Sequence, residues 1–400
     1  MIKKPRYRRT TAPVASPLSG KPRLAVLDGL RLVAALMVVL YHYTAMDTPW
    51  NGHTRTIFPS LHHVSQYAWI GVEVFFLISG FVICMSSWGK SLGDFVVSRA
   101  SRLYPAYWAA VVITAIVISL WPQVEHIQSW AQIAANLTML QDGMHVRDVD
   151  GVYWTLFTEM KFYLLFALLV VTRGVNYRNC VLFCGVWTVI GITDYSVPND
   201  LLDMWAMPLF SPYFIAGIAL YLMYRFKPNA VLVGILVISF LLAENEIVKR
   251  VGLNLSEPNR SIAAWPAQIL IAVAFAVMTL IALGKFDRIQ WRWLTTAGAL
   301  TYPLYLLHEN IGWTIIHTLK ARVSPVPLVV GTAIAMMVLA WLLHRIVERP
   351  LGRRFRTTLD RAMTEMRQNS LQPKEREVPP PASEPHSQDP SQRVLAGSAR

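Results

Sequence analysis

The segment "RLAVLDGLRLVAALMVVLYHYTAM", residues 23–46, decides the fold of this 400-residue chain. Its apolar core has about 20 residues, the length that a helix needs to cross the hydrocarbon of a bilayer. It nevertheless carries ionisable groups at two depths, with Asp28 and Arg31 near its beginning and His42 near its end. Such groups are costly inside a membrane span and usually face a polar cavity. We therefore expect a membrane helix that contributes to a functional site.

The composition of the whole chain agrees with this interpretation. Hydrophobic residues make up 54% of the chain and charged residues only 15%, whereas soluble proteins have about 25% charged residues. The net charge of +13 is clustered between apolar segments, which indicates membrane orientation and argues against nucleic acid as a partner. The three cysteines lie in or beside apolar runs without metal-type spacing. We expect neither a disulfide framework nor a metal site.

Ten apolar stretches predict an all-α, polytopic integral membrane protein. They cover approximately residues 25–44, 68–87, 103–121, 152–172, 180–193, 204–224, 229–243, 262–284, 296–317 and 326–346. With the N-terminus inside, the inner segments carry about three times as many Lys and Arg as the outer loops. We expect about ten transmembrane helices with both termini in the cytoplasm. Three regions follow: a basic N-terminal tail (1–23), a membrane domain (24–356), and a C-terminal tail (357–400) whose Pro, Ser and Glu content predicts disorder.

Basic side chains lie at the predicted cytoplasmic ends of two spans. Arg31 and His42 are eleven residues apart, which places them on one helix face about 16 Å apart along the axis. Arg99 and Arg102 are three residues apart, and two guanidinium groups one turn apart suit a diphosphate. Together with Arg31 they predict an anion site at the inner mouth. The alternatives are snorkelling by Arg31 and ordinary positive-inside marking.

Polar groups in other spans are candidates to act with His42. Glu73 in the second span and Glu159 in the fourth are carboxylates that can orient an imidazole. Tyr163 lies one turn from Glu159, and Trp154 begins the same span, so both are candidate substrate-binding residues. His308 belongs to a polar His-Glu-Asn cluster in the ninth span. The alternatives for these groups are structural ion pairs and hydrogen bonds between helices.

Six sequence blocks, in order, carry a resemblance to a known family. They are "LDGLRLVAALMVVLYH", "GVEVFFLISGFVI", the Arg-x-x-Arg element from Arg99 to Arg102, "WTLFTEMKFY", "LTYPLYLLHENIGW" and "VERPLGRRF". Over about residues 24–356 the chain resembles the membrane acyltransferase-3 family, whose members O-acylate polysaccharides and other envelope or secreted acceptors. The resemblance implies a multi-pass protein of the inner membrane, a cytoplasmic acyl-CoA donor with acetyl-CoA favoured, and an extracytoplasmic saccharide acceptor such as an O-antigen or exopolysaccharide.

The charge layout and the resemblance together give a hypothesis for the mechanism. Arg31, Arg99 and Arg102 bind the phosphates of the donor, and His42 acts as general base or as a covalent acyl relay. We expect Glu73 or Glu159 to orient His42, His308 to contribute to catalysis, and a common passage to join the arginines to the imidazole. Two alternatives remain open: a transporter or flippase of a polysaccharide precursor, and a b-type haem protein with His42 and His308 as ligands.

Overall fold

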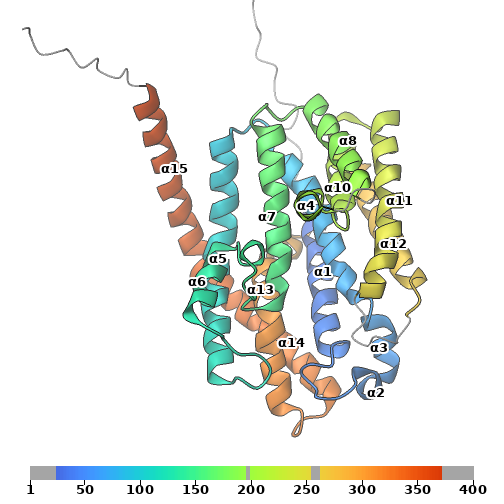
Figure 1. The fold of residues 1–400 in the computed structure, drawn as a ribbon, viewed down its shortest axis with the longest axis vertical. Helices are drawn as coiled ribbons and strands as arrows, with labels where there is room; N and C mark the ends of the chain where they lie inside the picture. The colour runs from blue at the N-terminus through green and yellow to red at the C-terminus, as the bar shows by residue number, and fades with distance from the viewer. Residues whose placement is uncertain (1–23, 195–198, 254–261, 372–400) are drawn as a thin grey trace, which may run out of the picture.

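The computed structural model describes residues 24–194, 199–253 and 262–371, which form helices and connecting turns without a strand (Figure 1). Eight helical stretches in these ranges are long and apolar enough to cross a membrane. The chain is therefore an all-helical, polytopic membrane protein, as the sequence predicts. Two other helices, α8 (Tyr177–Asp194) and α13 (Arg292–Leu319), occupy the remaining two expected ranges.

The other long helices are α1 (Ala25–Thr44), α4 (Gly71–Ser87), α5 (Leu92–Leu120), α7 (Trp154–Phe166), α10 (Ser211–Phe226), α11 (Ala230–Leu253), α12 (Trp265–Ala282), α14 (Pro325–Leu343) and α15 (Arg349–Leu371). Short helices fill the connections: α2 (Thr54–Ile57), α3 (Pro59–Ser65), α6 (Trp130–Thr138), α9 (Asp200–Ala206), and the single turns η1 (Ala68–Ile70), η2 (Asp142–Met144) and η3 (Gly151–Tyr153). Wide π-helical turns, η4 (Ala167–Val171) and η5 (His344–Glu348), continue α7 and α14.

Helix α5 begins eleven residues before the apolar stretch predicted at 103–121. Its start is fixed by a capping box, in which the Asp94 amide donates to Ser91 Oγ over 3.2 Å and the Ser91 amide donates to the Asp94 carboxylate over 3.2 Å. The early start adds about three turns to the helix. Arg99 and Arg102 therefore lie on a continuous helix that is anchored at its N-terminus.

Helix α13 packs closely against α1 because two glycines remove steric obstacles. A Cβ at Gly312 would overlap the ring of Tyr43, and a Cβ at Gly298 would overlap the side chain of Asp28. Small residues let membrane helices approach at short distance. The two glycines lie opposite the two ends of α1, so they bring the ionisable groups of both helices together.

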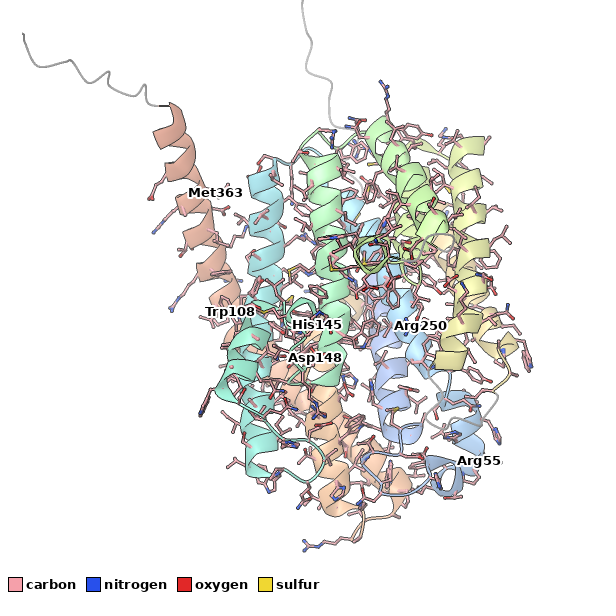
Figure 2. All side chains as sticks on the ribbon, viewed as in Figure 1. Arg55, Trp108, His145, Asp148, Arg250 and Met363 are labelled. Carbon is pink, nitrogen blue, oxygen red and sulfur yellow. The ribbon has the colours of Figure 1, made fainter. Side chains whose placement is uncertain are left out.

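The C-terminal helix extends past the boundary expected at residue 356. Helix α15 follows η5 without a break and continues to Leu371, so residues 357–371 are helical where the sequence predicts a disordered tail. The Phe355 ring meets Trp108 of α5 edge-on at 5.5 Å, which holds the helix against the bundle (Figure 2). The predicted N-terminal tail and residues 372–400 lie outside the described residues.

Candidate active site

A cavity of about 100 Å³ opens between α1, α4, α5, α7 and α13. Arg31, Arg99 and Arg102 line it together with Glu159 and Tyr163. The structure thus brings the three predicted arginines, from two helices, to one cavity. Most of the remaining lining is aromatic or aliphatic.

The arginines give this cavity a surplus of positive charge. Arg31 lies 3.8 Å from Asp28, and Ser79 Oγ donates a short hydrogen bond of 2.5 Å to Glu159. Tyr163 is within hydrogen-bond reach of both Glu159 and Arg99. Three guanidinium groups face two carboxylates, so one positive charge remains for an anion. Arginine suits phosphate because its planar fork makes paired hydrogen bonds.

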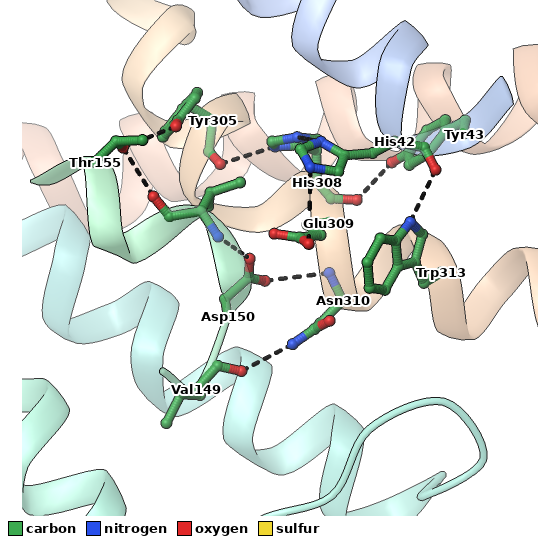
Figure 3. A network of polar contacts seen from close by, with 11 residues as sticks. His42, Tyr43, Val149, Asp150, Thr155, Tyr305, His308, Glu309, Asn310 and Trp313 are labelled. Carbon is green, nitrogen blue, oxygen red and sulfur yellow. Dashed lines mark hydrogen bonds and ion pairs between the residues drawn. The ribbon is translucent and has the colours of Figure 1, made fainter. Parts of the chain in front are cut away.

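A second polar cluster is built around two imidazoles (Figure 3). His42 Nδ1 lies 3.0 Å from His308 Nε2, and His308 Nδ1 lies 2.8 Å from the carbonyl oxygen of Tyr305. A carbonyl only accepts, so Nδ1 of His308 carries a proton. With His308 neutral, its Nε2 accepts from Nδ1–H of His42. This chain of hydrogen bonds leaves the lone pair of His42 on Nε2, where it can act as a base.

The main chain of both helices holds this pair in place. Trp313 Nε1 donates to the His42 carbonyl over 2.9 Å, and the Tyr43 hydroxyl donates to the His308 carbonyl over 2.7 Å. His308 is completely buried. The pair is therefore fixed by side chains from the facing helix as well as by its own hydrogen bonds.

The carboxylate nearest to the free nitrogen of His42 is that of Glu309, whose Oε1 lies 3.7 Å from Nε2. Glu309 is close to the buried Asp150, which accepts from the Asn310 amide over 3.2 Å. The Asn310 side chain donates to the Val149 carbonyl over 2.9 Å. The turn η3 is thereby joined to α13 next to the imidazole pair.

Neither carboxylate expected to orient His42 occupies that position. Glu73 is fully buried and pairs with Arg250 of α11 over 2.8 Å, and Glu159 lies in the cavity with Ser79. The expectation is corrected: His308 accepts from His42, and the adjacent carboxylate is Glu309. The reason is that α4 turns Glu73 toward α11.

The two predicted substrate-binding residues lie in different environments. Tyr163 lines the cavity with the arginines. Trp154 lies 5.6 Å from the guanidinium of Arg250, which also faces Trp69 at 4.9 Å and Phe210 at 4.7 Å (Figure 2). Trp154 thus belongs to an aromatic cage around a buried arginine.

The expected common passage is closed in this conformation. Within the described part of the chain, the cavity is lined by Tyr305, Thr155 and Phe75, while His42 and His308 are not among its lining residues. The Tyr305 hydroxyl is hydrogen-bonded to Thr155 Oγ1 at 2.8 Å, and the Phe75 ring meets the Tyr305 ring edge-on at 5.5 Å. Tyr305 therefore separates the arginine cavity from the imidazole pair.

The geometry disfavours the haem alternative. His42 Nδ1 and His308 Nε2 are hydrogen-bonded to each other at 3.0 Å, so no space remains between them for an iron ion and its macrocycle.

Reasoning from the sequence also missed three residues of the site. Glu309 is recognisable as the neighbour of His308, whereas Asp150 and Tyr305 become apparent only from contacts between distant segments.

Comparisons with known proteins were made for the whole chain. A family model described as an acyltransferase domain matches residues 24–345. Over 153 residues the chain is 31% identical to "Acyltransferase MdmB" of Streptomyces mycarofaciens, covering 36% of this chain and 39% of that protein. Over 114 residues it is 33% identical to "Exopolysaccharide production protein ExoZ" of Rhizobium meliloti (strain 1021), covering 26% and 35%. The chain thus spans little more than a third of each relative's length. No solved structure matches the chain.

Proposed function

The chain belongs to the acyltransferase family whose model matches it, and from that premise we propose that it transfers an acyl group from cytoplasmic acyl-CoA to a hydroxyl of an extracytoplasmic saccharide. The acyl group favoured is acetyl. The acceptor class is an envelope or secreted glycan such as an O-antigen or exopolysaccharide. The similarity to the exopolysaccharide production protein of Rhizobium meliloti supports this acceptor class.

The observation that carries the proposal is the convergence of Arg31, Arg99 and Arg102 on one cavity. Coenzyme A has a diphosphate and a 3'-phosphate, which match a site with surplus positive charge. The remainder of the cavity lining is largely apolar, which suits the pantetheine arm. The cavity leads from these arginines to Tyr305, whose carbonyl orients the imidazole pair.

The chemistry is assigned to Nε2 of His42. This nitrogen takes the proton of the acceptor hydroxyl while the oxygen attacks the thioester carbonyl. The carbon–sulfur bond then breaks, and the coenzyme A sulfur receives the proton from the imidazolium. Glu309, 3.7 Å from Nε2, stabilises the positive charge during this step. In the variant with a covalent relay, the same nitrogen carries the acyl group between donor and acceptor.

The arrangement in the membrane follows from the same proposal. We place ten spans in the inner membrane, comprising the eight apolar stretches together with α8 and α13, and both termini in the cytoplasm. The segment with α2 and α3 lies at the lower end of the bundle in Figure 1, and α15 rises toward the opposite end. The arginine cavity then opens toward the cytoplasm and the outer loops cover the acceptor side.

The test is acyl transfer by the purified protein in lipid nanodiscs. Release of free coenzyme A from acetyl-CoA is measured with and without isolated glycan, and the added acyl mass is identified by mass spectrometry. His42→Ala abolishes transfer and retains acetyl-CoA binding. Arg99→Gln with Arg102→Gln weakens acetyl-CoA binding, whereas Arg173→Gln, a cytoplasmic arginine outside this cavity, serves as the control.

A transporter or flippase is the second candidate. It would move a glycan precursor without consuming acyl-CoA. Loss of glycan export in cells that lack the protein, together with glycan that carries no acyl group in cells that have it, would support that candidate and contradict ours.

A further inference from the structure

We propose that Tyr305 is a positioning residue that keeps the acyl donor away from His42 until its side chain swings aside. This inference rests on the proposed function. It assigns the two parts of one residue to different tasks: the main chain orients the base, and the ring closes the cavity. The Tyr305 ring thereby controls when the donor thioester reaches the His42 imidazole.

The contacts of Tyr305 support both tasks. Its carbonyl oxygen accepts from His308 Nδ1 over 2.8 Å. Its ring lines the arginine cavity and packs edge-on against Phe75, and its hydroxyl is hydrogen-bonded to Thr155 of α7. The ring is thus held from two neighbouring helices. Rotation about the side-chain bonds moves the ring without moving the carbonyl.

His42 remains accessible from elsewhere. Its side chain keeps 12% of its surface exposed although it does not line the arginine cavity. In this proposal an acceptor hydroxyl reaches His42 from that exposed side, by a different route from the donor. A hydroxyl oxygen about 2.8 Å from both His42 Nε2 and Glu309 Oε1 is geometrically possible, because those atoms are 3.7 Å apart.

A barrier at this point has a chemical purpose. Water that reached the thioester beside His42 would attack its carbonyl carbon, and the carbon–sulfur bond would break to give a free carboxylic acid and coenzyme A. His42 would take the proton from the water and return it to the sulfur, as it does with an alcohol. Closed active sites prevent such side reactions. Tyr305 would hold the donor back until the acceptor is bound.

The test is hydrolysis of acetyl-CoA in the absence of acceptor, measured with protein in nanodiscs. Tyr305→Ala is expected to raise this hydrolysis about tenfold, because one bulky ring is removed. Tyr305→Phe and Thr155→Val keep the ring but remove the hydrogen bond, so each should give a smaller rise. These two variants preserve packing and keep the test informative if Tyr305→Ala does not fold.

Two further variants and the first three together discriminate the outcomes. Adding His42→Ala to Tyr305→Ala should abolish the extra hydrolysis, and persistence of that hydrolysis would overturn the proposal. Tyr302→Ala removes the same aromatic volume from the same cavity one turn away, so an equal rise in that variant would also overturn it. An unchanged rate in all three ring and hydrogen-bond variants would do the same. Failure of the proposed function is distinguishable, because the unmodified protein would then transfer no acyl group to glycan.

Discussion

At the scale of single residues, the unusual feature is that one imidazole orients another. His308 occupies the position in which many catalytic histidines have a carboxylate, and it accepts from Nδ1 of His42. A neutral partner fixes the tautomer without adding a negative charge. The carboxyl group lies instead on the side of Nε2, where Glu309 Oε1 is 3.7 Å away.

Replacing His308 should therefore damage turnover and spare donor binding. We expect His308→Ala to lower kcat by about 100-fold, because His42 loses the group that holds its lone pair on Nε2. The apparent affinity for acetyl-CoA should stay within about twofold of the unmodified protein, since His308 does not line the cavity. His317→Ala, on the outer turn of the same helix, is the matched control. Equal losses in the two variants would contradict the assignment.

A carboxyl group in the outer loop predicts a dependence of stability on pH. Burial raises the pKa of Asp148 from 3.8 to about 7, and Gln141 donates a hydrogen bond of 2.7 Å to its carboxylate (Figure 2). The folded state thus binds this proton more tightly than the unfolded state. Its contribution to the unfolding free energy is largest below about pH 4, falls as the pH rises to about 7, and is constant above that.

Substitution of this residue provides the measurement. The midpoint of thermal unfolding of the detergent-purified protein should be compared at pH 5 and pH 8. The Asp148→Asn variant should show a smaller difference between these midpoints, because the amide does not titrate. If the variant kept the whole difference, other groups would be responsible.

The residues of the site were predictable to different degrees. The pairing of Arg99 with Arg102 follows from helical spacing, whereas the approach of Arg31 to them depends on how the helices pack. The partner of His42 did not follow, since its choice depends on which helices are neighbours. Arg250 lies 177 positions beyond Glu73 in the sequence, and local patterns carry no sign that they pair.

At the scale of helices, α4 and α11 are joined by that buried ion pair. Glu73 is fully buried and Arg250 is 8% exposed. Removing one partner of a buried pair leaves a charge without compensation, which costs about 3 kcal/mol or more. We expect Arg250→Met to lower the unfolding free energy by roughly this amount, measured as a reduced midpoint of thermal unfolding.

The double variant distinguishes charge from packing. Glu73→Leu combined with Arg250→Met removes both charges, so it should recover much of the loss seen in Arg250→Met alone. A double variant that is less stable than the single one would mean that the aromatic cage around Arg250 depends on the guanidinium itself.

The existence of the helices was predictable, whereas several of their limits were not. Each of the ten apolar ranges contains a helix in the structure, although the range 204–224 is interrupted by a turn between α9 and α10. Hydropathy missed the first turns of α5, which depend on the cap formed by Ser91 and Asp94. It also missed α15, a polar helix whose packing on α5 includes Phe355. Apolar length measures the contact with lipid, and helices often continue beyond it.

At the scale of the whole molecule, the proposed topology predicts a labelling pattern. The native cysteines Cys84, Cys180 and Cys184 are buried, so the folded protein should give little background with a membrane-impermeant maleimide. Arg55→Cys in α2 should be labelled in intact spheroplasts, because Arg55 is exposed at the proposed outer end (Figure 2). Thr357→Cys in α15 should be labelled only in inverted vesicles. The proposed topology has an odd number of spans between these two sites, which places them on opposite sides of the membrane. Labelling of Thr357→Cys from outside would mean an even number and would contradict that topology.

The carbonyl of Tyr305 has a practical consequence for anyone who maps this protein by mutagenesis. Every substituted residue at that position keeps the same main-chain oxygen, so the outermost member of the hydrogen-bond relay survives each replacement. Mutagenesis at this position would therefore report only the effect of losing the Tyr305 ring. Infrared or nitrogen-15 spectra of the His308 imidazole would report the hydrogen bond to the Tyr305 carbonyl. Replacement of the amide by an ester through chemical synthesis would test that bond, which side-chain substitution leaves unchanged.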